Sequence, residues 1–105
     1  MKTRFLRSAK EDVAIIGVKL DSFREGWADV FESELLRAVS TIGDYPRLQP
    51  RTEDGPEEPE NREYFISRFE IRIIYAIWMN EAVIVALIHA RQKPGRWRHR
   101  LTELG

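Results

Sequence analysis

The strongest hydrophobic pattern lies in the second half of the chain. Apolar and polar residues first alternate there, and one face of the implied strand carries Phe69, Ile71, Ile73, Tyr75 and Ile77. After a short break at residues 79–81, residues 82–90 are almost wholly apolar and rich in β-branched side chains. Such a run is typical of a central strand covered on both faces. The pattern predicts a β-hairpin with a tight turn at Asn80, because Asn tolerates the left-handed conformation.

The first half has the periodicity of two amphipathic helices. The first apolar stripe is Ala9, Val13, Ile16 and Leu20, and the second is Trp27, Phe31, Leu35, Ala38 and Ile42. Ser8 lies three residues before Glu11, which is the spacing of a capping box and predicts that the first helix starts there. Residues 21–26 are predicted to form a turn, and Gly43 is predicted to end the second helix.

The remaining segments are shorter or more polar. Residues 2–6 are compatible with an edge strand, residues 63–67 with a further strand, and Leu101 and Leu104 with a short terminal helix or tail. Residues 45–61 combine prolines with charges and predict an extended surface loop, mobile around Asp54 and Gly55. The order β-α-α-β-β-β predicts a single α+β domain over residues 1–105. In this domain, a two-helix hairpin packs on one face of a small, mainly antiparallel sheet.

Composition excludes several classes of protein. The 17 basic and 17 acidic residues balance, which argues against coating of nucleic acid through bulk charge. The absence of cysteine excludes a disulfide framework and a thiol nucleophile. No apolar run is long enough for a membrane span, so we expect a cytoplasmic protein that does not associate with membranes. Two histidines ten residues apart, without a carboxylate cluster, predict no metal site, and we expect no cofactor.

The neutral total conceals two segments of opposite charge. Residues 51–63 contain six acidic residues and two arginines, whereas residues 91–100 contain five cations and no acid. This asymmetry is compatible with separate partners for the two segments. The simpler interpretation, which we favour for the acidic loop, is a solvated surface.

The final hairpin resembles the RelE/ParE superfamily, the toxins of bacterial type II toxin–antitoxin modules. Residues 69–75, Phe-Glu-Ile-Arg-Ile-Ile-Tyr, are similar to that superfamily's aromatic-Arg-Ile-x-Tyr strand. Residues 84–91 are similar to its apolar strand that ends in His-small-Arg, here His89-Ala90-Arg91. This ending, followed by Pro94 and Trp97, is closer to ParE, a plasmid stabilisation protein, than to RelE. The chain departs from the pattern at Gln92, where ParE-like chains often have a second Arg.

The resemblance implies a toxin that inhibits growth by binding a protein target such as DNA gyrase, without catalysis of its own. The expected target-binding residues are Arg72, His89, Arg91, Arg96, Trp97, Arg98 and Arg100. It also implies neutralisation by a cognate, DNA-binding antitoxin that wraps the helices and the sheet in a hetero-oligomer. The expected antitoxin-binding residues are Trp27, Phe31, Leu35 and Trp78.

Two other functions remain open at this stage. A RelE-like, ribosome-dependent and metal-independent mRNA endonuclease would use His89 for acid–base work and Arg91 on the phosphate. The neutral charge and the absence of Tyr after Arg91 disfavour it. A degenerate module member would keep the fold and antitoxin binding but poison nothing.

Structural roles are also open for several of the named residues. Trp97 and Leu101, four residues apart, are compatible with packing back on the sheet, and Arg72 with pairing to Glu63 or Glu70.

Overall fold

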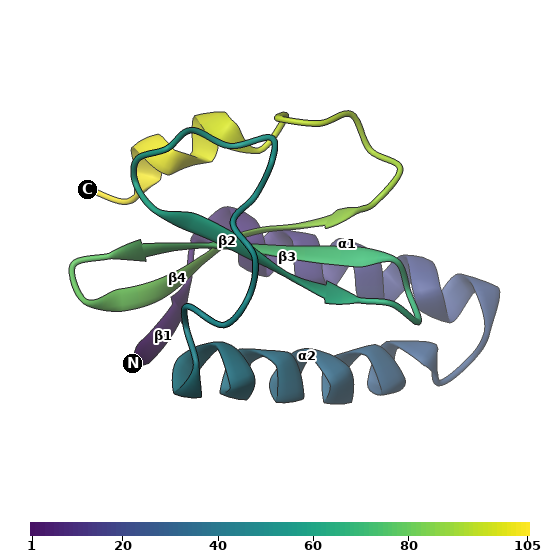
Figure 1. Cartoon of the computed structure of the whole chain (residues 1–105). Helices are drawn as coiled ribbons and strands as arrows, with labels where there is room; N and C mark the ends of the chain where they lie inside the picture. Colours follow the sequence, from purple (N-terminus) through teal and green to yellow (C-terminus); the bar gives the residue numbers. More distant parts are fainter.

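The computed structural model describes residues 1–105 and consists of a four-stranded sheet with two helices on one face (Figure 1). The elements follow the predicted β-α-α-β-β-β order and end in a short 3-10 helix. Their bounds are β1 Lys2–Phe5, α1 Arg7–Phe23, α2 Trp27–Asp44, β2 Asn61–Ile66, β3 Ile71–Trp78, β4 Glu81–His89 and η1 Arg98–Glu103.

The strand order in the sheet is β1-β4-β3-β2. The β2–β3 and β3–β4 pairs are antiparallel, whereas β1 runs parallel to β4 and covers only its first half, Glu81–Ile84. The consecutive residues Ala82–Leu87 are buried, which confirms the prediction of a central strand covered on both faces. The β3–β4 register shifts between Ile74 and Tyr75, so Val85 faces no partner on β3.

The β3–β4 hairpin turns at Met79 and Asn80, as predicted. Both residues have positive φ, 50° and 61°, which is the geometry of a two-residue turn that matches the twist of the flanking strands. Trp78 and Glu81 pair across this turn, so the second strand begins at Glu81.

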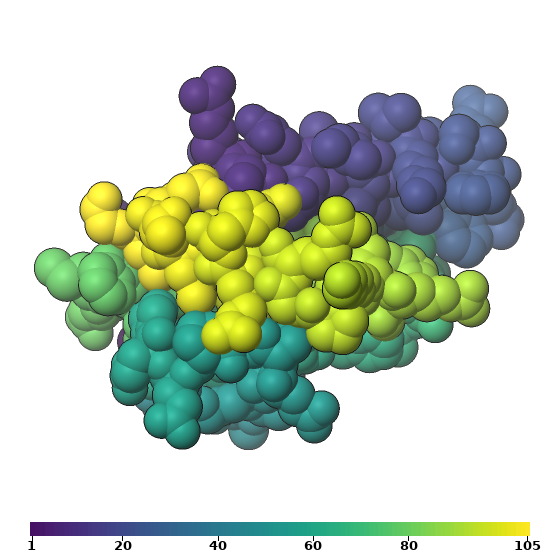
Figure 2. Space-filling view, turned by 90° about the horizontal axis from the view of Figure 1, so that it is seen from above, coloured from purple at the N-terminus to yellow at the C-terminus, as the bar shows by residue number.

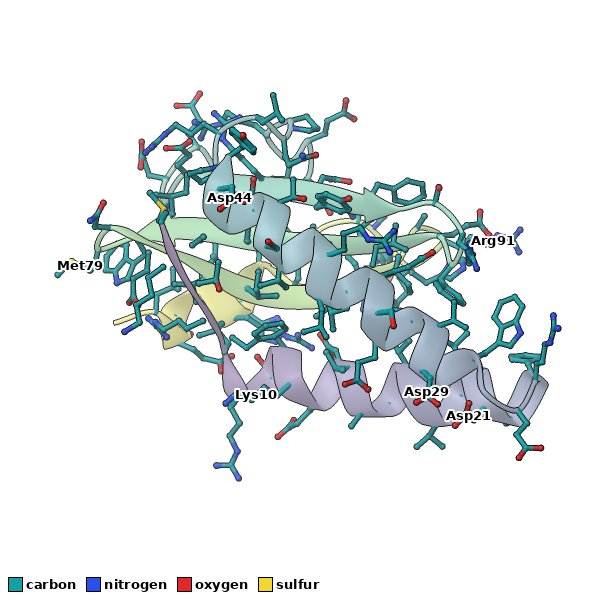
Figure 3. The ribbon with its side chains drawn as sticks, turned by 90° about the horizontal axis from the view of Figure 1, so that it is seen from below. Lys10, Asp21, Asp29, Asp44, Met79 and Arg91 are labelled. Carbon is teal, nitrogen blue, oxygen red and sulfur yellow. The ribbon has the colours of Figure 1, made fainter.

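The predicted apolar stripes of both helices face the sheet (Figure 3). On α2, the last four residues of the stripe are buried, and Trp27 packs edge-on against Phe69 at 5.3 Å between ring centroids. On α1 only Ala9 is fully buried, and the other three stripe residues are partly buried against the same core. The two helices therefore bury one face of the sheet, as predicted for this order of elements.

The predicted capping box is wrong. Helix α1 begins at Arg7 after Leu6, with no side-chain cap, and the Ser8 hydroxyl lies 3.4 Å from the Glu103 carboxylate instead. Leu6 donates its backbone N–H to the carbonyl of Ile84, so strand pairing determines where the helix starts. The predicted 21–26 turn is also too long, because α1 continues to Phe23.

Gly43 does not follow the second helix but lies inside its last turn, since α2 ends at Asp44. A Cβ at Gly43 would lie 3.1 Å from the carbonyl oxygen of Met1, and the Met1 ammonium donates to the Gly43 carbonyl at 2.8 Å. The glycine therefore allows the start of β1 to approach the helix closely.

The opposite face of the sheet is covered by two segments far apart in sequence, the 45–60 loop and the C-terminal residues 90–105. Figure 2 shows the two packed side by side on this face. The loop was predicted from its charges to be solvated surface. That prediction is wrong at Asp54, whose side chain is only 11% exposed. At the end of the loop, Asn61 is buried and already belongs to β2. No helix of the fold is long and apolar enough to cross a membrane.

Candidate functional site

Asp54 connects the acidic loop, the sheet and the C-terminal segment. Its two carboxylate oxygens accept hydrogen bonds from the Arg72 guanidinium at 2.7 and 3.0 Å. The Oδ2 atom also accepts the backbone N–H of Gly95 and the indole N–H of Trp97, both at 2.9 Å. These bonds, above all those from Arg72, hold the pKa of Asp54 well below its usual range, although burial opposes the shift.

Arg72 lies within this network rather than on a free surface. It also donates to the Glu63 carboxylate at 2.8 Å, and its side chain is 14% exposed. Hydrogen bonds from its guanidinium to Asp54 and then to Glu63 raise the pKa of Arg72. Of the roles left open for Arg72, the structure shows the pairing with Glu63 and adds Asp54, which the sequence did not indicate as a partner.

Trp97 and Arg100 hold the C-terminal segment against the fold. Trp97 is 2% exposed and belongs to the hydrophobic core, so packing accounts for its side chain. Arg100 pairs with Asp12 at 2.6 Å and donates to the carbonyl of Val85 at 3.2 Å. The bonds to Asp12 raise the pKa of Arg100. Trp97 and Arg100, both predicted to bind a target, therefore anchor the C-terminal segment to the rest of the fold.

The other four cations of this C-terminal segment are free. We call residues 91–98 the basic arm; within it, Arg91, Lys93, Arg96 and Arg98 are exposed. None of the four takes part in the ion pairs of the fold. In Figure 2 the arm crosses the outer surface between α1 and the acidic loop. The fold thus presents four unpaired positive charges from a segment fixed by Trp97.

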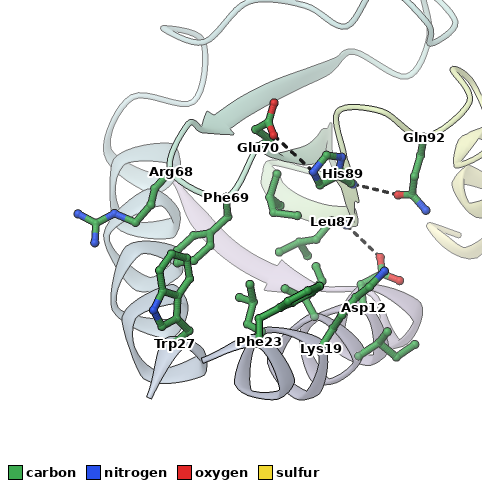
Figure 4. Close-up of a pocket in the computed structure, with 14 residues that line it drawn as sticks. Asp12, Lys19, Phe23, Trp27, Arg68, Phe69, Glu70, Leu87, His89 and Gln92 are labelled. Atoms are coloured by element: carbon green, nitrogen blue, oxygen red, sulfur yellow. Dashed lines mark hydrogen bonds and ion pairs between the residues drawn. The ribbon is translucent and has the colours of Figure 1, made fainter. Parts of the chain in front are cut away.

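His89 sits at the start of the basic arm, where β4 ends. Its Nδ1 accepts the backbone N–H of Arg91 at 3.1 Å, and its Nε2 lies 3.8 Å from the Glu70 carboxylate. The Gln92 side chain accepts the backbone N–H of His89 at 2.9 Å (Figure 4). Because β4 ends at His89, Arg91 belongs to the turn that follows the strand rather than to the strand itself. An acceptor Nδ1 places the hydrogen of the neutral imidazole on Nε2.

A groove of about 580 Å³ opens between the helices and this end of the sheet (Figure 4). Apolar side chains of α1, the β2–β3 turn, β3 and β4 line it, and Trp27 lies at one end. Two of the lining residues, Ile15 and Phe23, are 65% and 80% exposed. Polar groups at its rim come from Asp12, Lys19, Arg68, Glu70, His89 and Gln92. An exposed apolar surface with a polar rim makes this groove a candidate protein-interaction site.

A sequence profile of the family described as ParE toxin of type II toxin-antitoxin system, parDE, matches residues 3–94 of the chain. This chain belongs to the ParE toxin family. The match confirms the predicted resemblance and places the chain with ParE rather than RelE. It ends at Pro94, so four of the residues predicted to bind a target, Arg96, Trp97, Arg98 and Arg100, lie beyond it.

The fold of this ParE-family chain is similar to that of a solved chain from the chromosomal ParDE TA system of P. aeruginosa. The TM-score is 0.70 at 15% sequence identity, with 85% of this chain and 95% of that chain covered. This likeness confirms the predicted fold. No curated protein matches the chain.

The residues predicted to bind an antitoxin lie in different environments in the ParE-family fold. Phe31 and Leu35 are 1% and 5% exposed, so they belong to the core and present no surface. Trp27 lines the groove, whereas Trp78 is half-buried beside the β3–β4 turn at the opposite end of the sheet. The sequence did not indicate Phe23 as a residue of this groove, because residues 21–26 were predicted to form a turn, whereas α1 extends to Phe23. No group of His, Cys, Asp and Glu side chains is arranged to hold a metal ion.

Proposed function

We propose that this ParE-family chain arrests growth by binding a protein target, DNA gyrase, through the basic arm, and that a cognate antitoxin neutralises it. The observation that carries the proposal is the set of four unpaired cations on a segment anchored at Trp97. Because the backbone that carries these arginines is already ordered, only their side chains lose conformational freedom on binding, and they can contact a complementary acidic surface.

The surroundings of the arm favour a protein over a nucleic acid. Glu53, Glu57 and Glu58 are exposed on the acidic loop, and the loop contacts the arm where Asp54 accepts the Gly95 N–H. A continuous polyanion laid along the arm would meet these carboxylates, whereas a protein surface with both signs of charge can complement them. The neutral net charge of the chain agrees with this choice.

The geometry at His89 supports binding rather than RNA cleavage. A general base must offer a free nitrogen to the hydroxyl that it activates. In this fold Nδ1 accepts the Arg91 N–H and Nε2 faces Glu70, so both ring nitrogens are directed at groups of the chain itself. We therefore assign His89 to shaping the start of the arm.

The groove lined by Phe23 and Trp27 is the proposed antitoxin contact. Its apolar floor and exposed apolar rim suit an amphipathic segment of a partner, and burial of this surface would stabilise a hetero-oligomer. In this proposal the antitoxin carries the DNA-binding domain, and the complex acts in the cytoplasm.

The test is expression of the chain alone from a tightly controlled promoter, with growth, mRNA integrity and plasmid DNA breakage recorded together. Purified chain is assayed in parallel against purified DNA gyrase in a supercoiling reaction. The critical variant combines Arg91→Ala, Arg96→Ala and Arg98→Ala. Its matched control combines Lys2→Ala, Lys10→Ala and Arg37→Ala, which removes the same charge from exposed cations outside the arm.

We expect growth arrest with intact mRNA, broken plasmid DNA and inhibited supercoiling for the wild type and for the control. We expect at least about a tenfold loss of inhibition for the arm variant, since several charged contacts are removed together. Early mRNA cleavage would instead favour the endonuclease function. Harmless expression of folded protein would favour the degenerate one, and full toxicity of the folded arm variant would reject the arm as the contact surface.

A further inference from the structure

We infer that Asp54 is a positioning residue for the basic arm. In this inference the acidic loop serves to hold the cations of the arm in a fixed arrangement for the target. The inference rests on the proposed function, since it concerns the surface that the target would contact. It gives the acidic loop a role in target binding, although the loop itself is not proposed to contact the target.

The first step is the connectivity of the Asp54 carboxylate. Oδ2 holds the arm at two points, the Gly95 backbone N–H and the Trp97 indole N–H, both at 2.9 Å. The Arg72 side chain holds the same carboxylate from β3, at 2.7 and 3.0 Å. The arm is therefore tied to the central part of the sheet through a single side chain from the loop.

The second step is that the loop itself is held in place. The Asn61 side chain is buried and donates to the carbonyls of Pro56 and Pro59, both at 2.7 Å. A Cβ at Gly55 would lie 2.7 Å from the Trp97 ring, so the loop backbone packs directly on the indole. Asp54 thus projects from a fixed backbone, and its hydrogen bonds fix the arm in turn.

The third step is the position of Asp54 along the arm. The His89–Gln92 contact shapes the start of the arm, and the Arg100–Asp12 pair holds the helix that follows it. Asp54 is the attachment between these two points. Without it, the backbone between Gln92 and Arg98 would keep the packing of Trp97 and the turn hydrogen bond from Arg98 to Gly95. Nothing else would tie the arm to the loop or to β3, and its cations would sample more arrangements. Ordering them on binding would then cost free energy.

The test uses the Asp54→Asn variant, which keeps the side-chain size but removes the charge that pairs with Arg72. We expect exchange of the Gly95 amide and the Trp97 indole hydrogen to accelerate by about tenfold or more, because local opening becomes easier. We also expect about a tenfold weaker inhibition of DNA gyrase. The matched control is Glu53→Gln, an adjacent exposed acid of the same loop, for which both quantities should stay at the wild-type level.

A purely structural role is separated by a second comparison. Ile42→Val removes one methyl group from the buried face of α2, far from the arm in sequence. It lowers the stability of the fold without changing the hydrogen bonds of Asp54. Positioning predicts that Ile42→Val keeps full inhibition although its unfolding temperature falls. Loss of inhibition in proportion to unfolding temperature for both variants would overturn the inference.

Trp97→Phe keeps most of the packing but removes the indole donor to Asp54, and it serves if Asp54→Asn does not fold. Faster exchange at Gly95 with weaker inhibition is the expected result. Unchanged exchange in the folded variants, or accelerated exchange with full inhibition, would overturn the inference. Failure of the proposed function is recognised separately, since the Arg91, Arg96 and Arg98 variant would then inhibit as the wild type does.

Discussion

The Trp97 indole N–H donates a 2.9 Å hydrogen bond to the carboxylate of Asp54, 43 residues earlier in the chain. This bond joins the acidic loop to the basic C-terminal segment on the face of the sheet that the helices leave open. The two charged segments are therefore one structural unit rather than two independent surfaces. The Asp54 carboxylate is fully hydrogen-bonded within this unit, whereas the cations of the basic arm remain available to a partner.

Replacing Arg72 with Met should destabilise the fold strongly. The change removes the positive charge that pairs with Asp54 and Glu63. Their carboxylates, 11% and 22% exposed, are then left without a cationic partner. We expect a loss of about 3 kcal/mol in the free energy of unfolding, as for other broken buried pairs. Urea denaturation measures it. Arg7→Met is the control, because the Arg7–Glu11 pair is highly exposed and such pairs contribute at most about 1 kcal/mol. Equal losses would contradict the internal role of Arg72.

The stability of the fold should fall in acid, and Asp54 should account for part of the fall. The pKa of Asp54 is lowered in the folded state from its ordinary value of 3.8, so its contribution is present above pH 3.8 and is lost as the pH decreases below it. The pKa of Glu60 is lowered in the same direction, chiefly by the hydrogen bond from Arg62. Denaturation curves for the wild type and Asp54→Asn should differ most near neutral pH and converge in acid. A constant difference at every pH would contradict this linkage.

Gly55→Ala should destabilise the loop and displace Trp97. The added Cβ would contact the side chains of Asn61 and Thr52 and lie 2.7 Å from the indole. Overpacking of this kind costs about 1–3 kcal/mol. Gly17→Ala is the control, because its Cβ would lie 3.7 Å from the Ala28 Cβ within a helix, where Ala is favoured by about 1 kcal/mol. Thermal unfolding should show opposite signs for the two variants, with Trp97 fluorescence changed only by Gly55→Ala.

Phe23→Ser should weaken antitoxin binding with little effect on the fold. Phe23 lines the groove and is 80% exposed, so its side chain contributes little to the core of the free toxin. Aromatic side chains at the centre of an interface commonly contribute about 2 kcal/mol, and the dissociation constant should rise at least about tenfold. Val18→Ser is the control on the same helix, since Val18 is 74% exposed but does not line the groove. Calorimetric titration with the cognate antitoxin measures both dissociation constants, and an equal change for Phe23→Ser and Val18→Ser would contradict the groove as the contact.

Much of the fold could be predicted because local patterns and burial agree in it. The stripe from Phe31 to Ile42 indicates which side of α2 is buried, and the continuous apolar run of β4 indicates burial on both faces. The packed sheet and helices satisfy both patterns. The helix ends were predicted less well. Ser8 and Gly43 have the residue types of caps, but contacts with Glu103 and Met1 from distant parts of the chain determine their roles.

For the candidate site, the sequence determined that opposite charges gather in two segments, that a Trp lies among the arginines, and that the ending of β4 resembles ParE. Only the tertiary structure decided which charges are free. Arg72 and Arg100 pair inside the fold, whereas Arg91, Lys93, Arg96 and Arg98 point to solvent, although all six side chains are cations. The difference depends on whether Asp54 or Asp12 lies within hydrogen-bonding distance, and a separation of 18 to 88 residues along the chain leaves no local signal of such a contact. Pairing across the sheet is a property of the packed fold, because desolvation makes each buried charge require a partner that only the folded chain supplies.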